Sequence, residues 1–304
     1  MKTPRIWDHT ALSDLRCEEL FARRHRDGLT RSGDEPAALL CGKAIHAGIR
    51  AYYAGLNEGE ATDAAVRAWG RPETALGADF RTLDLALAYV AAYRRAYPRP
   101  WGFDVLWNEQ YIASDTLSGI PDRGVQRGLD GLVYALELKT TSGKVGVAWQ
   151  EQWAYSQQAA IQLELLEHEF NKCGTFGEHC SCHPDAACCQ CGKEQITMAG
   201  FWMDAVYLSS RKDGPRASDF VRCGPFTYSA ALRMDLLMQV ARDSARANEI
   251  VEGKGEPPRP TGIRNGACTA WNRLCQFHRY CRLDPGDRED AYAMARATGE
   301  LVVR

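Results

Sequence analysis

The sequence predicts an α/β protein whose core is a small mixed sheet flanked by helices. Two observations favour this class: helical patterns fill most of the region before residue 101, and strand-like segments then alternate with further helices. Helices before a small sheet, with more helices after it, indicate layers of helix on sheet rather than a helix bundle or a β-sandwich.

Helices are expected where apolar residues recur at helical spacing between stop signals such as Gly55 and Pro98. The expected helices lie at residues 9–25, 37–55, 61–70, 76–98, 147–170 and 229–251. Strands are expected at residues 103–114, 199–209 and 219–228, and in a hairpin within residues 119–141. A Pro/Gly-rich loop at residues 253–262 separates the last helix from a C-terminal cysteine triplet.

The predicted hairpin reads GIPDRGVQRGLDGLVYALELKTT, with the turn signal Asp130-Gly131 between its two strands. Because side chains alternate along a strand, Glu137 and Lys139 lie on one face of the second strand. A buried charge is costly unless it has a partner, so two charges at the end of an apolar run need an explanation. A structural ion pair at a sheet edge is one explanation.

The hairpin also brings Asp122 close to Glu137, which offers a second explanation. Two carboxylates make an oxygen-rich, negatively charged niche that suits Mg²⁺ or Mn²⁺. Lys139 is then available to position a water or to offset charge that develops on a phosphate. This combination of side chains indicates phosphodiester chemistry.

Composition places the chain among ordinary soluble proteins. Its 304 residues are enough to bury a substantial core, and no stretch approaches the roughly 18 apolar residues of a membrane span. The N-terminal stretch lacks the apolar region of a secretory signal, so a cytoplasmic location without membrane contact is expected. A net charge of −2 means that nucleic-acid binding needs a local basic patch, and the candidates are FARRHRDGLTR at residues 21–31 and YRRAYPRPWG at residues 93–102. Each patch is alternatively the solvated face of a helix.

Twelve cysteines in a chain without a secretory signal favour metal sites over disulfides, because the cytosol keeps thiols reduced. Six of them fall within residues 173–191 and three within residues 268–281. Cys17, Cys41 and Cys223 stand alone.

Pro121-Asp122 followed after fourteen residues by Glu137-Leu138-Lys139 resembles the signature of the PD-(D/E)XK nuclease superfamily. Upstream, Gly42 and His46 look like the Gly-x-x-x-His element of the RecB-like branch. Downstream, Gln158 matches the glutamine of that branch's Gln-x-x-x-Tyr motif, whereas Gln162 stands where the family has tyrosine.

The resemblance implies a restriction-endonuclease-like core and a catalytic centre. In such a centre His46, Asp122 and Glu137 hold Mg²⁺ or Mn²⁺. Lys139 orients or activates the attacking water, and Gln158 helps to position the site or the strand. Imidazole with two carboxylates is a chemically sensible ligand set that leaves coordination positions for water and a phosphate oxygen.

The C-terminal triplet is one thiolate short of the four that an iron–sulfur cluster or a structural zinc requires. Members of the RecB-like branch that carry a 4Fe-4S cluster, including the AddB type, the CRISPR-associated type and phage or prophage proteins, supply the fourth cysteine from the first helix. The resemblance therefore implies a cluster on Cys17, Cys268, Cys275 and Cys281. Zinc at the same thiolates, Cys41 as the fourth ligand and a disulfide arrangement are the alternatives.

The cysteine-rich window is an insert that the resemblance does not explain. Cys188-x-x-Cys191 is a knuckle that holds one side of a tetrahedral zinc, and Cys180, Cys182 or His183 supply the other side, with Cys173 a further candidate. So polar a segment has almost nothing to bury without a metal, which favours one structural Zn²⁺. The alternative is a flexible loop.

The resemblance implies a metal-dependent DNA nuclease, an exonuclease that acts in recombination or repair on DNA with free ends, single-stranded or made so by a recombination protein or helicase partner. A catalytically inactive nuclease-fold protein that binds or scaffolds nucleic acid is the alternative from another class, and a sequence-specific endonuclease is an alternative enzyme. The expected organisation is an N-terminal helical region of the nuclease domain at residues 1–100, the catalytic sheet and helix at 101–171, the insert at 172–195, the rest of the core with the iron–sulfur cysteines at 196–283, and a tail at 284–304.

Overall fold

The computed structural model describes residues 6–31, 35–70, 79–99, 102–114, 117–143, 145–172, 196–211, 213–262, 267 and 275–303. The chain divides into two compact units. The first consists of Met1–Asp34, Asp115–Ser118 and Met234–Arg304, and the second of Glu35–Ser114 and Gly119–Arg233. The cysteine-rich insert and Cys268 lie outside the described residues.

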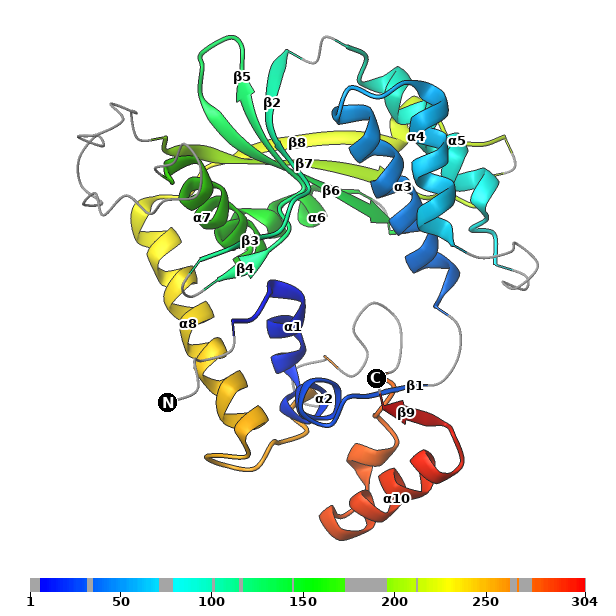
Figure 1. Cartoon of the computed structure of the whole chain (residues 1–304), viewed down its shortest axis with the longest axis vertical. Helices are drawn as coiled ribbons and strands as arrows, with labels where there is room; N and C mark the ends of the chain where they lie inside the picture. Colours follow the sequence, from blue (N-terminus) through cyan, green and yellow to red (C-terminus); the bar gives the residue numbers. More distant parts are fainter. Residues whose placement is uncertain are drawn as a thin grey trace. The chain divides into compact units, whose positions relative to one another are not determined.

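A five-stranded mixed sheet forms the centre of the second unit (Figure 1). In spatial order its strands are β2 (Phe103–Asn108), β5 (Arg123–Arg127), β6 (Val133–Thr141), β7 (Met198–Tyr207) and β8 (Phe220–Phe226). Only the β6–β7 pair in this sheet is parallel, and the other neighbours are antiparallel. Two further short strands, β3 (Ile112–Ala113) and β4 (Ser118–Gly119), pair with each other.

The hairpin predicted from the Asp130-Gly131 signal is present as β5 and β6. Val125 pairs with Tyr134, and the Arg127 N–H donates to the Leu132 carbonyl at 2.9 Å to close the turn. Gly131 has a φ of 71°, a left-handed conformation that costs glycine little because it has no Cβ. Strand β6 is then followed by helices that return the chain to β7, as a parallel pairing requires.

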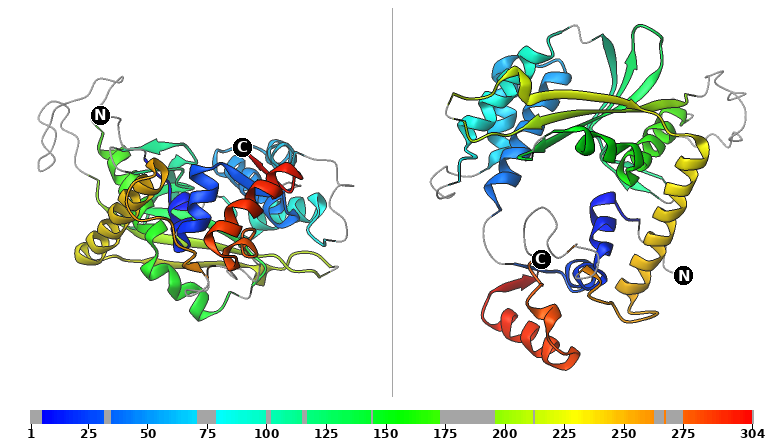
Figure 2. Two further views of the ribbon diagram at one scale, coloured as in Figure 1. Left: turned by 90° about the horizontal axis from the view of Figure 1, so that it is seen from below. Right: turned by 180° about the vertical axis from the view of Figure 1, so that it is seen from behind.

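Three helices pack on one face of this sheet and bury the hydrophobic core: α3 (Ala37–Tyr53), α4 (Glu58–Trp69) and α5 (Leu83–Ala96). Figures 1 and 2 show them gathered at one side of the strands. Ile45 of α3 and Leu138 of β6 are both completely buried in that core. The helices start where the sequence supplies caps, since the Asn57 side chain accepts from the N–H of Glu60 at 3.0 Å and the Thr82 hydroxyl accepts from the N–H of Leu85 at 3.1 Å.

The opposite face of β6 meets α7 (Gln157–Asn171), because Glu137 alternates with the core residue Leu138 and bonds to side chains of that helix. One helix was expected over residues 147–170, and the structure instead has α6 (Val147–Glu151), a 3₁₀ turn (Gln152–Tyr155) and α7. The interruption falls at Ser156, whose backbone is extended and whose hydroxyl caps α7 by accepting from the Ala159 N–H at 3.4 Å.

The first unit combines segments from both ends of the chain. It contains α1 (His9–Ser13), a 3₁₀ turn (Asp14–Arg16), α2 (Glu18–Phe21), a π-helical turn (Ala22–Arg26), β1 (Leu29–Arg31), most of α8 (Ala230–Glu252), a 3₁₀ turn (Tyr280–Arg282), α10 (Pro285–Ala297) and β9 (Leu301–Val303). Strands β1 and β9 pair antiparallel. Leu29, Phe277, Tyr292 and Leu301 belong to a buried cluster that joins these segments, so the expected C-terminal tail is part of a folded core.

The fold class predicted from the sequence is confirmed in its architecture: the protein is α/β, with a small mixed sheet flanked by helices and a helical N-terminal region. The restriction-endonuclease-like character of this core stays an expectation of the sequence resemblance. The proposed residue boundaries of the domains stay a prediction. Across the described ranges, no helix is both long enough and apolar enough to cross a membrane.

Candidate functional site

Asp122 lies at the start of the hairpin, directly before β5, and its side chain is held by the backbone of the next strand. The Leu138 N–H donates to Asp122 Oδ2 at 2.6 Å, so the carboxylate is fixed beside the Glu137 end of β6. Nδ1 of His46, from the middle of α3, lies 3.8 Å from the same oxygen. The structure therefore brings together the histidine and the first carboxylate that the sequence predicted.

Glu109 is a third candidate ligand and the second acid beside His46 and Asp122, and it was not predicted from the sequence. One ligand atom each from His46, Glu109 and Asp122 lies within 4.8 Å of the others, and among the described residues this is the group with metal-site spacing. Glu109 follows β2 with a φ of 43°, and its N–H donates to the Asp122 carbonyl at 2.9 Å. Arg50 approaches one of its carboxylate oxygens at 3.5 Å. The other oxygen, Oε1, is buried and has no hydrogen-bond partner among the described residues.

Glu137 does not belong to the group formed by His46, Glu109 and Asp122. Its carboxylate is instead bound by three side chains. Lys139 Nζ is 2.6 Å from Oε1, and Gln158 Nε2 donates to Oε1 at 2.6 Å. Gln162 Nε2 donates to Oε2. Because Gln158 and Gln162 are four residues apart on α7, they lie on one helix face and reach the two oxygens of one carboxylate. Gln162, which departs from the family's tyrosine, thus has a defined partner at the site.

Burial and charge set the protonation of these groups. Burial lowers the pKa of His46 to about 4, so the imidazole is neutral near pH 7 and has a ring-nitrogen lone pair that can bind a cation. Burial, with the Glu137 charge, raises the pKa of Asp122 well above its ordinary value, and burial also raises that of Glu109. Burial opposes ionisation of Glu137 too, but the Lys139 charge and the donated hydrogen bonds hold its pKa below the ordinary value.

Arg123 supplies a buried positive charge next to this acidic group. Its side chain is fully buried, one of its nitrogens is 4.0 Å from Asp122 Oδ2, and its guanidinium lies over the Tyr53 ring at 4.5 Å. The Arg123 charge opposes the rise in the pKa of both Asp122 and Glu109. Sequence reasoning passed over this residue because an arginine in a predicted strand carries no local sign of burial.

The donor set fits a hard divalent cation. Two carboxylates and a neutral imidazole lie within reach of one another, and Oε1 of Glu109 is buried without a hydrogen-bond partner among the described residues. This set of groups matches the oxygen-rich coordination of Mg²⁺ or Mn²⁺. The predicted ligand set of His46, Asp122 and Glu137 shares two members with the observed group. Glu137 stays a proposed ligand, because a carboxylate oxygen that accepts a hydrogen bond still has a second lone pair.

Aromatic side chains border the lysine. Lys139 Nζ lies 5.8 Å from the centre of the Trp153 ring, within the range of a cation–π contact. Tyr228 donates its hydroxyl to the Trp153 carbonyl, which ties the 3₁₀ turn to the segment after β8. The Trp149 and Trp153 rings pack edge to face at 5.7 Å. These contacts fix the segment that follows the lysine strand.

Three of the four predicted iron–sulfur cysteines belong to the first unit. Cys17, Cys275 and Cys281 are free thiols, and burial together with the charges of the other two raises the pKa of Cys281 to about 12. Cys41, the alternative fourth ligand, is instead completely buried in the hydrophobic core of the second unit. The insert cysteines, Cys173, Cys180, Cys182, Cys188 and Cys191, lie with Cys268 outside the described residues.

Comparison with solved structures finds a distant likeness. The chain is similar to a crystal structure of a presumed exonuclease from Eubacterium rectale, with a TM-score of 0.46 and 12% sequence identity over 90% of this chain and 88% of that one. No family model matches the chain, and no curated protein does. A likeness this weak carries no functional argument, so function must be derived from the side chains of the chain itself.

Proposed function

We propose that the second unit is a Mg²⁺- or Mn²⁺-dependent nuclease that hydrolyses phosphodiester bonds in DNA. The observation that carries this proposal is the convergence of His46, Glu109 and Asp122 within 4.8 Å beside the Glu137–Lys139 pair. The same residues carry the resemblance to the PD-(D/E)XK superfamily, with Glu109 added by the structure. As that resemblance implies, the substrate is single-stranded or end-containing DNA, and the reaction is exonucleolytic.

The side chains at the site have distinct tasks in this proposal. The cation would be held by His46, Glu109 and Asp122, with Glu137 as a further ligand. A bound divalent cation stabilises charge on the phosphate and lowers the pKa of water. Lys139 stays protonated, because the Glu137 and Asp122 charges outweigh burial and raise its pKa. Its ammonium is therefore placed to donate to a phosphate oxygen or to orient a water. Gln158 and Gln162 fix the orientation of Glu137, and the bond from Gln162 helps to hold its pKa low.

Digestion of end-labelled linear and covalently closed single-stranded DNA, with Mg²⁺ or Mn²⁺, tests the proposal. Wild type should degrade the linear strand, Lys139→Ala should not, and the order of label release gives the polarity. Cutting of the closed circle would identify an endonuclease instead. Binding without cutting by both proteins would leave Glu137 and Lys139 as a structural pair and favour the nucleic-acid scaffold.

We further propose that Cys17, Cys275 and Cys281, with Cys268, hold a 4Fe-4S cluster in the first unit. Two segments far apart in sequence supply thiols that interact electrostatically with one another. Thiolates around one zinc lie about 3.8 Å apart, given a Zn–S bond of about 2.3 Å. Zinc at the same four thiolates is the alternative, and the metal content of the purified protein separates the two.

Anaerobic purification tests this cluster. The wild-type protein should be brown, Cys275→Ala should lose the colour, and Cys223→Ala should keep it, because Cys223 is a buried thiol of β8 in the other unit. A colourless protein that contains only zinc would eliminate the iron–sulfur assignment. The proposed structural zinc of the insert is tested by metal analysis of Cys275→Ala, in which zinc should persist.

A further inference from the structure

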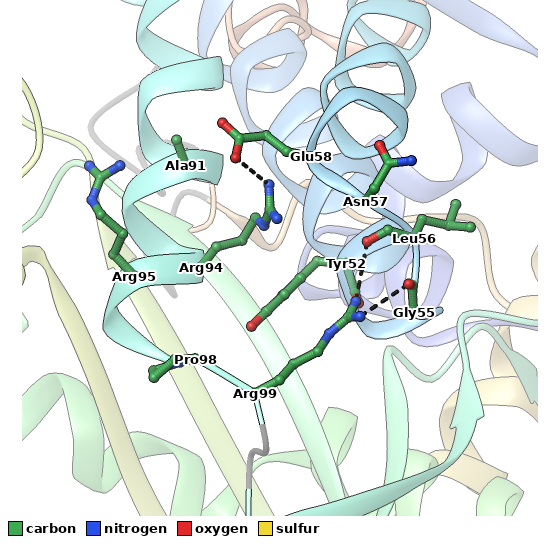
Figure 3. Close-up of a pocket in the computed structure, with 10 residues that line it drawn as sticks. All are labelled: Tyr52, Gly55, Leu56, Asn57, Glu58, Ala91, Arg94, Arg95, Pro98 and Arg99. Carbon is green, nitrogen blue, oxygen red and sulfur yellow. Dashed lines mark hydrogen bonds and ion pairs between the residues drawn. The ribbon is translucent and has the colours of Figure 1, made fainter.

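A hollow of about 570 Å³ lies in the second unit between the end of α3, the start of α4 and the last turn of α5 (Figure 3). We call it the arginine hollow, because Arg94, Arg95 and Arg99 line it. Among the described residues that line it, Glu58 is the one acid. Three positive charges against one negative charge leave the hollow with a net positive charge near neutral pH.

The described partners of Arg99 include backbone carbonyls and an aromatic ring. Arg99 donates to the carbonyls of Gly55 at 3.0 Å and Leu56 at 3.2 Å, and its guanidinium lies 4.7 Å from the centre of the Tyr52 ring. Backbone carbonyls satisfy the donors of Arg99 without neutralising its charge. Arg95 is exposed to solvent on α5.

Arg94 has the one acidic partner in the hollow. Its NH1 lies 3.3 Å from Glu58, but the Glu58 side chain is 76% exposed, so solvent screens this pair and its contribution is small. Nε of Arg94 is buried and has no hydrogen-bond partner among the described residues. An anion that entered the hollow would therefore compete with a weak ion pair and meet an unsatisfied donor.

In the other arginine-rich stretch, at residues 21–31, several of the described arginines have acidic partners. Arg23 bonds to Glu19 and Asp27 at 2.9 Å each and also to Glu289, while Arg24 pairs with Asp14 at 3.0 Å. Carboxylates thus pair with Arg23 and Arg24. The stretch at residues 93–102 contributes Arg94, Arg95 and Arg99 to a hollow whose described lining has excess positive charge.

The hollow and the candidate metal site share helix α3. Tyr52 follows His46 by six residues, which is a rise of about 9 Å along the helix axis. Phosphates repeat about every 3.4 Å along one strand of a duplex. Six residues also turn the helix by about 240°, so a strand with its scissile phosphate at the metal site needs a few nucleotides both to cover this rise and to pass around α3 to the hollow.

We propose that the arginine hollow binds a backbone phosphate of the substrate strand a few nucleotides from the bond that is cut, an inference that rests on the proposed nuclease function. The contact is to phosphate rather than to a base, because Tyr52 is only 4% exposed and two guanidinium groups cover its ring. Phosphate contacts position a strand without reading its sequence. The hollow therefore sets the register of the strand and gives no base preference.

The experiment is a salt titration of binding, with a fluorescently labelled 20-nucleotide single strand in EDTA so that no cutting occurs. Arg95→Ala should weaken binding about fivefold at 0.1 M salt and reduce the slope of log K against log salt by about 0.7, the value for one contact on a single strand. Glu58→Gln should strengthen binding, since it removes the opposing charge. Arg67→Ala is the matched control: it removes the same charge from the exposed face of α4, outside the hollow.

Equal affinity and slope in Arg95→Ala and Arg67→Ala would overturn the proposal, as would unchanged or weaker binding in Glu58→Gln. Free thymidine monophosphate provides a further test. If Arg95→Ala weakens binding of the monophosphate but leaves binding of the strand unchanged, the hollow is a nucleotide site and the proposed strand contact is overturned.

A small diester, bis(p-nitrophenyl) phosphate, separates this proposal from the nuclease function. The ester is too short to reach the hollow, so Arg95→Ala should hydrolyse it at the wild-type rate with Mn²⁺. A reduced rate would show that Arg95 acts through the metal site and would overturn the strand contact. If wild type cleaves neither the ester nor DNA, the nuclease function fails, while the binding titration still decides whether the hollow holds a strand.

Discussion

Replacement of Gln162 by methionine isolates the contribution of α7 to the site. Gln162 is buried and donates to Oε2 of Glu137, a carboxylate that is only 2% exposed. Methionine has nearly the same shape but no donor, so the buried charge loses one of its three partners. A hydrogen bond to a charged group contributes about 1.5–3 kcal/mol, and we expect the free energy of unfolding of the second unit to fall by about 2 kcal/mol.

Urea denaturation in EDTA, followed by tryptophan fluorescence, measures this loss. With a slope of about 3 kcal/mol/M, the midpoint should fall by about 0.7 M. Gln239→Met is the matched control, because Gln239 also donates to a carboxylate four residues away, Asp243 at 2.8 Å, but does so on the exposed surface of α8. Its effect should stay within about 0.5 kcal/mol.

The pH dependence provides a second signature with a definite sign. The folded-state pKa of Glu137 is held below its ordinary value of 4.5, so the stabilisation is present above pH 4.5 and is lost as the pH falls through the folded-state pKa. Gln162→Met raises that pKa, and the difference between wild type and variant should therefore shrink as Glu137 becomes protonated. A loss no larger than that of Gln239→Met, or one that does not change with acidification, would refute the role assigned to Gln162.

Three further changes test other parts of the second unit. Glu109→Gln should weaken Mn²⁺ binding roughly tenfold in calorimetry, since hard cations prefer charged oxygen ligands, and unchanged affinity would remove Glu109 from the site. Arg222→Met should lower the free energy of unfolding by about 3 kcal/mol. Asp204 is completely buried and bonded to Arg222 Nε at 2.6 Å, so the substitution leaves this buried carboxylate without its charge partner. A urea midpoint like that of wild type would contradict this expectation. Gly48→Ala should cost about 1–3 kcal/mol in thermal unfolding, because its Cβ would lie 2.7 Å from a methyl group of Val90 on α5, and a neutral result would show that the helices can separate.

The parts of the fold that the sequence predicted are those that local physics determines. The β5–β6 hairpin follows from Asp130-Gly131 and the alternation around Leu138, both of which are local signals. The helix expected at residues 9–25 is instead several short turns, because tertiary bonds override periodicity there. Arg23, in the π-helical turn, bonds to Glu289, which lies 266 residues away in sequence. No window of the sequence contains that partner.

The same distinction divides the candidate site. Glu137 and Lys139 were predictable because two charges at the end of a buried strand conflict with their surroundings unless they have partners. Gln158 and Gln162 were visible as a helical pair, although their shared hydrogen-bond acceptor, Glu137, lies on another element. The orientation of the helix toward the strand is a tertiary fact that spacing alone does not contain.

Glu109 shows why a complete ligand set needs the fold. In sequence it lies inside the run expected as one strand, residues 103–114, and looks like any acid on a strand face; the structure instead ends β2 at Asn108. Two tertiary features turn Glu109 toward Asp122. The antiparallel pairing of β2 with β5 places Asn108 opposite Arg123. The backbone of Glu109 is left-handed, and its N–H then reaches the Asp122 carbonyl. A non-glycine residue with positive φ is strained, and such strain concentrates at functional sites. The strain and the orphaned Oε1 occur in the same residue, which is expected if the backbone is held in place to present that carboxylate to a cation.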